Sequence, residues 1–367
     1  EIAWYLERYV NWPRGVFDDR AKLVVEGLPK WGRAIYDAIN VEAAREALKT
    51  WDSPGPAERR FTVHVDRDLP DGTPQEKQER ANEAATALLA LPWELIHDER
   101  GFLFQGARPV RVRRSLPNRF RQPALATEAP IRVLLVSPRP EDDSAAYIDH
   151  RSSARPLVET LSELGELARF KLLEPPTFPA LEAELNRARS ANEPYHVVHF
   201  HGHGVWDRKH GLGQLCFEDP ADEAKFEHRR SQLIDSKRIA EVVRDHRIPL
   251  FFLEACQSAK STTDPSASVA GRLLESGVAS VAAMSHSVLV ETARLFIAEF
   301  YKELLSGKRV GQAMLAGQRA LEGNTLRGRT FTGEVHLQDW FVPVLFQEED
   351  DPQIIRDLPS EQVQAIW

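Results

Sequence analysis

Cysteine is scarce in this chain of 367 residues, which contains only Cys216 and Cys256. Two thiols cannot build a disulfide framework or a four-thiolate metal site, so the sequence predicts a protein of the reducing cytoplasm. No uninterrupted apolar run reaches the roughly 18 residues of a membrane-spanning helix, and the first residues lack the pattern of a secretory signal. The chain opens on Glu1 rather than Met, from which we expect a processed product or a piece of a longer polypeptide.

Positive charge is not in excess either. The 47 Lys and Arg residues stand against 55 Asp and Glu residues, a net charge of −8, which argues against affinity of the whole chain for nucleic acid or an anionic membrane. Arginines do gather between residues 108 and 121, but they lack interleaved stacking aromatics apart from Phe120. A solvated strand face is therefore favoured over direct nucleic-acid contact. These arginines are Arg108, Arg111, Arg113, Arg114, Arg119 and Arg121.

The composition is that of a soluble globular protein, with 42% hydrophobic and 28% charged residues, and the length predicts two or three domains. The sequence pattern predicts a smaller α/β lobe over residues 1–125 and the main domain over residues 126–348. An acidic C-terminal tail is expected over residues 349–367, and the acidic cluster at 348–351 is expected to be solvated.

Hydrophobic patterning indicates the fold of both parts. The first 50 residues have helical spacing broken by Pro13 and Pro29, which predicts two or three short helices. The main domain alternates short apolar runs, such as 131–136 and 249–253, with helical stretches. Runs without alternation suit strands buried on both faces, so a mainly parallel sheet between two layers of helices is predicted.

Two of the predicted strands end in polar strings, HFHGHG at 199–204 and LEACQSA at 253–259. Ligands and catalytic groups gather at the carboxyl ends of parallel strands, which meet at one edge of the sheet. A thiol becomes a useful nucleophile beside an imidazole, and His203 precedes Cys256 by 53 residues. Cys216 lies in an alternating apolar string, which favours core packing.

These two strings resemble the His and Cys motifs of CHAT domains, caspase-like cysteine peptidases related to separases, metacaspases and legumains. A separation of about 50 residues is also that between the His and Cys of caspases. The resemblance extends to the strings WYLERYVNWPRGVFDDRA at 4–21, LPWELIHD at 91–98, FYKELLSGKRVGQAMLAGQRAL at 300–321 and DWFVPVLFQ at 339–347. It implies a caspase-like α/β/α sandwich with His203 as general base and Cys256 as nucleophile.

The chemistry of such a dyad suggests further site residues. The backbone N–H groups of Gly204 and Cys256 are expected to bind the oxyanion, because glycine leaves its amide accessible. By likeness to metacaspases, Glu254 is expected to bind an Arg or Lys of the substrate, although legumains combine Glu at this place with Asn specificity. The alternative is that Glu254 pairs internally, for instance with Arg139. Trp340 is expected either to wall the substrate cleft or to lie in the core.

Other functions stay open at this point. His199, His201 and His203 alternate along a strand and could ligate zinc, which would make the protein a hydrolase of another class. The same cleft could instead hold peptides without cleaving them. The peptidase chemistry itself requires no metal or organic cofactor and takes a protein as substrate. We expect control by an upstream sensor domain, an activator protein or oligomerisation, and the resemblance implies a role in bacterial defence.

Overall fold

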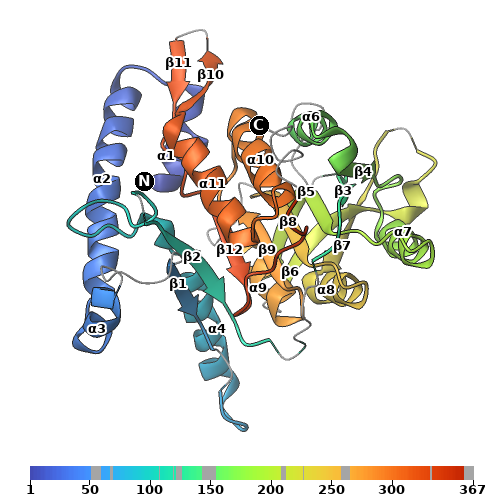
Figure 1. The fold of residues 1–367 in the computed structure, drawn as a ribbon, viewed down its shortest axis with the longest axis horizontal. Coiled ribbons are helices and arrows are strands. Elements are labelled where there is room, and N and C mark those ends of the chain that lie inside the picture. Colours follow the sequence, from blue (N-terminus) through green and yellow to red (C-terminus); the bar gives the residue numbers. More distant parts are fainter. Residues whose placement is uncertain are drawn as a thin grey trace.

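The computed structural model describes residues 1–50, 59–66, 69–106, 108–118, 120, 126–142, 154–207, 212–225, 227–257, 265–330 and 333–358. Within them, a ten-stranded sheet lies between two layers of helices (Figure 1). Its strands are β1 (Arg59–His64), β2 (Val110–Ser115), β3 (Ile131–Val136), β4 (Ala168–Leu172), β5 (Val197–Asp207), β6 (Leu212–Glu218), β7 (Ser231–Asp235), β8 (Leu250–Gln257), β9 (Ser280–Met284) and β12 (Pro343–Gln347).

The main path of the sheet runs β1-β2-β12-β9-β8-β5-β3-β4, and β6 and β7 branch from β5. Every pair along the main path is parallel except β12 with β9. The branch pairs, β5 with β6 and β6 with β7, are antiparallel. The predicted α/β fold with a mainly parallel sheet is confirmed.

Alternation along the strands divides the core into two layers. Val133 and Leu135 face one layer, while Leu134 and Val136 face the other. The first layer is formed with α1 (Ile2–Glu7), α2 (Val16–Ile39), α6 (Arg155–Glu163), α10 (Val290–Leu305) and α11 (Val310–Gly323). The second is formed with α4 (Gln75–Ala90), α7 (Phe178–Ser190), α8 (Ser236–Asp245) and α9 (Pro265–Glu275). Burial on both faces explains why these strands are continuous apolar runs.

The remaining elements are short helices and a separate hairpin. They are η1 (Tyr9–Asn11), α3 (Glu42–Thr50), η2 (Trp93–Leu95), η3 (Gly165–Leu167), η4 (Pro220–Asp222) and a separate hairpin of β10 (Leu326–Thr330) and β11 (Gly333–His336). Among the described residues, no helix combines the length and the hydropathy needed to cross a membrane.

The N-terminal residues do not form a separate sheet. β1 pairs with β2, and β2 joins the main sheet through β12, where Phe346 stands opposite Arg114. The expected helix break at Pro29 is wrong, because α2 continues through it. Val24 and Leu28 bury one face of this helix. Gly32 allows a close approach to η2, since a Cβ there would come within 1.9 Å of the Leu95 carbonyl oxygen.

The arginines of β2 correct the expectation of a solvated strand face. Arg114 is 2% exposed and donates to both carboxylate oxygens of Glu94, at 2.6 and 2.9 Å. Arg113 is also buried and donates to the Glu348 carbonyl at 2.6 Å. Each charge is taken up by a partner far away in the sequence. Arg119 and Arg121 lie outside the described residues.

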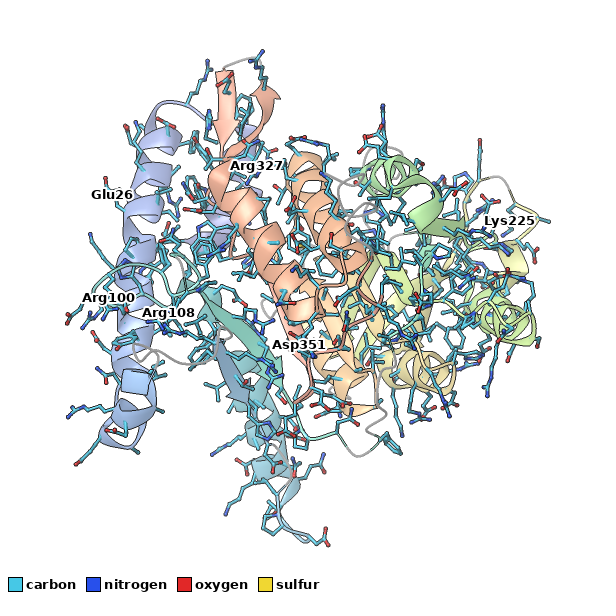
Figure 2. All side chains as sticks on the ribbon, viewed as in Figure 1. Glu26, Arg100, Arg108, Lys225, Arg327 and Asp351 are labelled. Carbon is cyan, nitrogen blue, oxygen red and sulfur yellow. The ribbon has the colours of Figure 1, made fainter. Side chains whose placement is uncertain are left out.

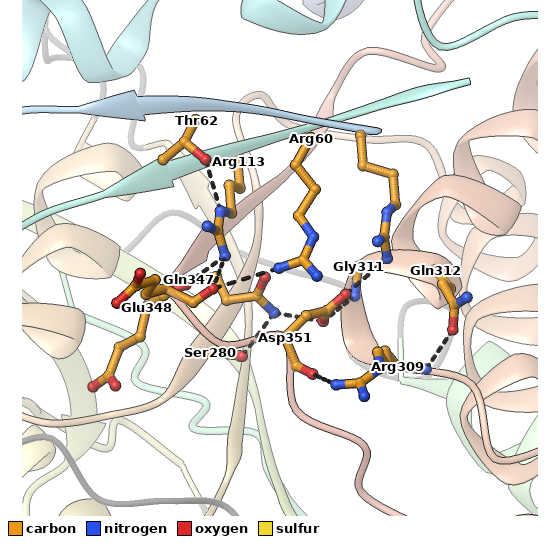
Figure 3. A network of polar contacts seen from close by, with 12 residues as sticks. Arg60, Thr62, Arg113, Ser280, Arg309, Gly311, Gln312, Gln347, Glu348 and Asp351 are labelled. Carbon is orange, nitrogen blue, oxygen red and sulfur yellow. Dashed lines mark hydrogen bonds and ion pairs between the residues drawn. The ribbon is translucent and has the colours of Figure 1, made fainter. Parts of the chain in front are cut away.

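The acidic cluster at 348–351 is likewise not a solvated stretch throughout. Glu349 and Asp350 are exposed, but Glu348 and Asp351 are buried. Asp351 lies near the end of β12 and the start of α11, as Figure 2 shows. Arg111, Gly311 and Gln347 donate to its carboxylate, at 2.7, 2.8 and 2.9 Å, in the network of Figure 3. The segment expected to be a tail is therefore held against the fold, and it continues so beyond Asp351, since Ile354 and Ile355 are buried in the core.

Candidate active site

The two polar strings meet at the carboxyl edge of the sheet, where β5 and β8 are parallel neighbours. His201 stands opposite Glu254 and His203 opposite Cys256, and one residue further Gly204 stands opposite Gln257. The strings were expected to follow the strands, but β5 extends through the whole of the first string and β8 extends to Gln257 within the second. A parallel ladder fixes the register of every residue in it, so the fold itself brings positions 203 and 256 together.

Glu254 is part of a buried polar group below this pair. Its carboxylate oxygen Oε2 lies 3.4 Å from His199 Nε2, and His199 Nδ1 lies 3.2 Å from the hydroxyl of Tyr301 on α10. The His199 ring also stacks on Phe252, with ring centres 4.3 Å apart. All of these side chains are buried. The internal alternative expected Arg139 as the partner, and the structure gives His199 instead.

His201 occupies the position between His199 and His203 along β5. Its Nδ1 lies 3.4 Å from the hydroxyl oxygen of Ser137, which follows β3. Burial lowers the pKa of His201, against the opposing effect of Glu254. Burial alone would raise the pKa of Glu254, but His201 and the hydrogen bond with His199 outweigh it and hold that pKa below its ordinary value.

The zinc alternative finds no support in this arrangement. In the described part of the chain, no group of three His, Cys, Asp or Glu side chains could hold a metal ion. His199 faces Tyr301 and Glu254, and His201 faces Ser137. Because residues two apart on a strand are separated by about 7 Å, three alternating imidazoles do not converge on one ion without leaving the strand conformation.

Arg139 is an exposed side chain at the same edge of the sheet. Its backbone N–H donates to Glu218 Oε1 at 2.9 Å, and Arg229 pairs with the other carboxylate oxygen of Glu218 at 2.8 Å. These groups border a cleft of about 520 Å³. Ser137 also lines this cleft, and its hydroxyl oxygen contacts His201. The cleft also contacts Leu172, Leu173, Glu174, Pro175, Pro176 and Glu223.

Trp340 and Cys216 lie in the core. Trp340 is 2% exposed and stacks on Phe104 with ring centres 3.9 Å apart. Its burial corrects the expectation of a cleft wall and matches the core alternative. Cys216 is fully buried, and burial raises the pKa of its thiol to about 11.

Sequence reasoning missed Tyr301, Ser137 and His286. The first two lack a local signal, because contact with β5 is what distinguishes them. His286 had a signal: it follows the apolar run 278–284 just as His203 and Cys256 follow theirs. Its Nδ1 lies 3.1 Å from the hydroxyl oxygen of Ser285, and burial lowers its pKa to about 4. It lies two residues beyond β9, the other neighbour of β8.

The fold and site define an α/β protein with a histidine and a cysteine in register at the carboxyl edge of its sheet. The chain matches the CHAT domain family over residues 83–345 and belongs to that family. This confirms the family inferred from the two motifs. No curated protein matches the chain significantly.

Three solved structures to which this chain is similar complete the comparison. The Arg-specific cysteine proteinase gingipain R has 12% identity and a TM-score of 0.44, over 88% of this chain and 70% of that chain. Saccharomyces cerevisiae separase, in its complex with securin, has 12% identity and a TM-score of 0.36, over 71% of this chain and 15% of that chain. The Drosophila initiator caspase Dronc has 10% identity and a TM-score of 0.34, over 65% of this chain and 93% of that chain.

Proposed function

We propose that this CHAT protein is a cysteine endopeptidase that cleaves partner proteins through Cys256 and His203. The observation that carries the proposal is the β5–β8 register, which sets His203 opposite Cys256 at the edge of the sheet. A cysteine and a histidine at neighbouring positions are the minimum that thiol catalysis requires. Membership of the CHAT family supports the same chemistry.

In this mechanism His203 takes the proton of the Cys256 thiol, and the thiolate attacks the peptide carbonyl carbon. The N–H groups of Gly204 and Cys256 bind the oxyanion that forms. His203 then gives its proton to the leaving amine as the C–N bond breaks, which leaves a thioester on Cys256. Water, deprotonated by His203, hydrolyses the thioester and regenerates the thiol.

The substrate side chain is proposed to enter the cleft beside Ser137 and Arg139. The expected preference for Arg or Lys depended on Glu254 and loses support, because this carboxylate is buried and bonded to His199. A cationic substrate is not needed to give Glu254 a partner. Control by an activator, a sensor domain or oligomerisation belongs to the same proposal, because an unrestrained peptidase would damage its own cell.

The experiment is cleavage of a peptide library by the full chain, read by mass spectrometry. Wild type is compared with Cys256→Ala, His203→Ala and the matched control Cys216→Ala. Cleavage that is lost in the first two variants and kept in the third supports the proposal. Cleavage that persists in Cys256→Ala contradicts it. A chain that binds library peptides tightly and leaves them intact, with and without candidate activators, would be a peptide-binding module instead.

A further inference from the structure

The buried polar group below the dyad has more parts than the proposed chemistry uses. Tyr301, His199, Glu254, His201 and Ser137 form a continuous polar column, with successive contacts of 3.2, 3.4 and 3.4 Å and with His201 opposite Glu254 in the ladder. Every member is at most 5% exposed. Burying a carboxylate is costly, so its presence inside a sheet calls for a function that an apolar residue would not supply.

We propose that this column positions the dyad and holds a buried negative charge beneath it, so that Glu254 sets the pH range in which Cys256 and His203 react. The inference rests on the proposed peptidase function. It assigns Glu254 to the control of the dyad rather than to a pocket for the substrate side chain.

The geometry places the charge within reach of both dyad residues. Glu254 precedes Cys256 by two positions on β8, and His201 opposite it precedes His203 by two positions on β5. Two positions on a strand correspond to about 7 Å. At that distance and an effective dielectric constant of about 20, one charge changes the ionisation of another by about one pH unit or more.

The neighbours of the carboxylate favour its ionised form: burial would raise the pKa of Glu254, but His201 and His199 hold it below its ordinary value. Tyr301 keeps its proton, because burial and then the charge of Glu254 raise its pKa far above the ordinary value. If that proton is donated to His199 Nδ1, His199 donates from Nε2 to Glu254. Burial disfavours the charged form of His201, and the nearby Glu254 carboxylate favours it. The groups that act on His201 besides these are His203 and Arg139.

The sign of the effect follows from the charge. A nearby carboxylate disfavours the Cys256 thiolate and favours the His203 imidazolium, so it raises both pKa values. Glu254→Gln removes the charge and keeps the shape of the side chain. The reactive pH range should therefore move as a whole to lower pH, by about one unit. Loss of packing alone would lower rates at every pH without moving the range.

The test measures alkylation of Cys256 by iodoacetamide between pH 4 and 10, in chains that also carry Cys216→Ala. We expect the midpoint of thiolate formation to fall by about one unit in Glu254→Gln and to stay at the wild-type value in Glu254→Asp, which keeps the charge. Glu94→Gln is the matched control, because Glu94 is an equally buried glutamate paired with Arg114 away from the dyad. It should lower stability without moving the midpoint.

An unchanged midpoint in a folded Glu254→Gln chain overturns the proposal, as does an equal shift in Glu94→Gln. If Glu254→Gln does not fold, Ser137→Asp tests the column with the opposite sign, since an added carboxylate beside His201 should raise the midpoint. No rise in a folded Ser137→Asp chain would also overturn it. Alkylation needs no substrate, so these results stand apart from the peptide-cleavage test of the proposed function.

Discussion

Arg111 of β2 donates a hydrogen bond of 2.7 Å to Asp351, which lies 240 residues later in the chain. The two side chains are 8% and 1% exposed. The other carboxylate oxygen of Asp351 accepts from the backbone of Gly311 in the first turn of α11, where a carboxylate also matches the helix dipole. A Cβ at Gly311 would come within 2.8 Å of this carboxylate. One acidic side chain thus joins β2, α11 and the segment after β12.

We therefore expect Asp351→Asn to destabilise the whole fold. The substitution leaves the Arg111 charge buried without its anion, and breaking a buried pair in this way costs about 3 kcal/mol. Urea unfolding at pH 7 measures the loss. Asp350→Asn is the control: this neighbour is exposed, so its replacement should change the free energy of unfolding by less than about 0.5 kcal/mol. Similar losses in both variants would contradict the structural role of Asp351.

The stability of the protein should also fall at mildly acidic pH because of His196. This side chain is 4% exposed; its Nδ1 accepts from the Arg132 N–H, and its Nε2 lies 2.9 Å from Thr127 Oγ1. Burial, and then the nearby Arg132 charge, lower the pKa of His196 to about 4. In the unfolded chain the pKa of His196 is about 6.5. Between the two pKa values the unfolded chain therefore binds a proton at His196 that the folded chain does not bind.

His196 therefore costs no stability above pH 6.5, and a loss of about 3 kcal/mol accumulates as the pH falls from 6.5 to 4. His196→Asn removes the titrating ring and keeps an acceptor for the Arg132 N–H. We expect this variant to be less stable than wild type at pH 7 but to lose less stability on acidification. Urea unfolding at pH 4, 5, 6 and 7 tests this expectation, and parallel curves for the two proteins would refute it.

How far the sequence predicts this molecule depends on whether a feature is local. The run at 131–136 is apolar at every position but one, and β3 has those bounds because both of its faces are covered. The same reasoning places β5 and β8, and their polar ends carry His203 and Cys256. The candidate dyad could be named from the sequence because both polar strings lie at the carboxyl ends of strands and resemble the CHAT motifs, whereas their exact register is given by the β5–β8 pairing.

The features that sequence reasoning missed depend on contacts across long separations. Arg114 looks like a surface residue until Glu94 is seen beside it, and Glu348 looks solvated until Arg113 reaches its carbonyl. Tyr301 belongs to the site only because α10 packs on β5. From the sequence alone Pro29 predicts a helix end, but the packing of Val24 and Leu28 outweighs the hydrogen bond that proline cannot donate.

The two thiols should differ sharply in reactivity. Cys216 is fully buried, and its pKa of about 11 leaves almost no thiolate at neutral pH. Native protein treated with iodoacetamide at pH 7 should therefore gain one adduct, on Cys256, as measured by intact-mass spectrometry and peptide mapping. Cys256→Ala should gain none until it is unfolded in urea. Rapid labelling of Cys216 in the native protein would show that the strand pair β6–β7 opens readily.

Substrate preference should depend on Arg139 rather than on Glu254. Arg139 is exposed beside the cleft, whereas the Glu254 carboxylate is buried and bonded to His199. If the chain cleaves peptides, Arg139→Ala should raise KM several-fold with kcat little changed, the pattern of lost binding that is equal in the ground and transition states. Arg169→Ala, at an exposed position on β4, is the control and should change neither constant.

Glu254→Gln should instead leave the ranking of library peptides unchanged at each variant's own optimal pH, because a buried group bonded within the protein does not contact the substrate side chain. Comparison at a single fixed pH would confuse the two roles, since the pH range itself is expected to move. A selective loss of cleavage after Arg and Lys in Glu254→Gln, with other peptides unaffected, would place this carboxylate in the substrate pocket.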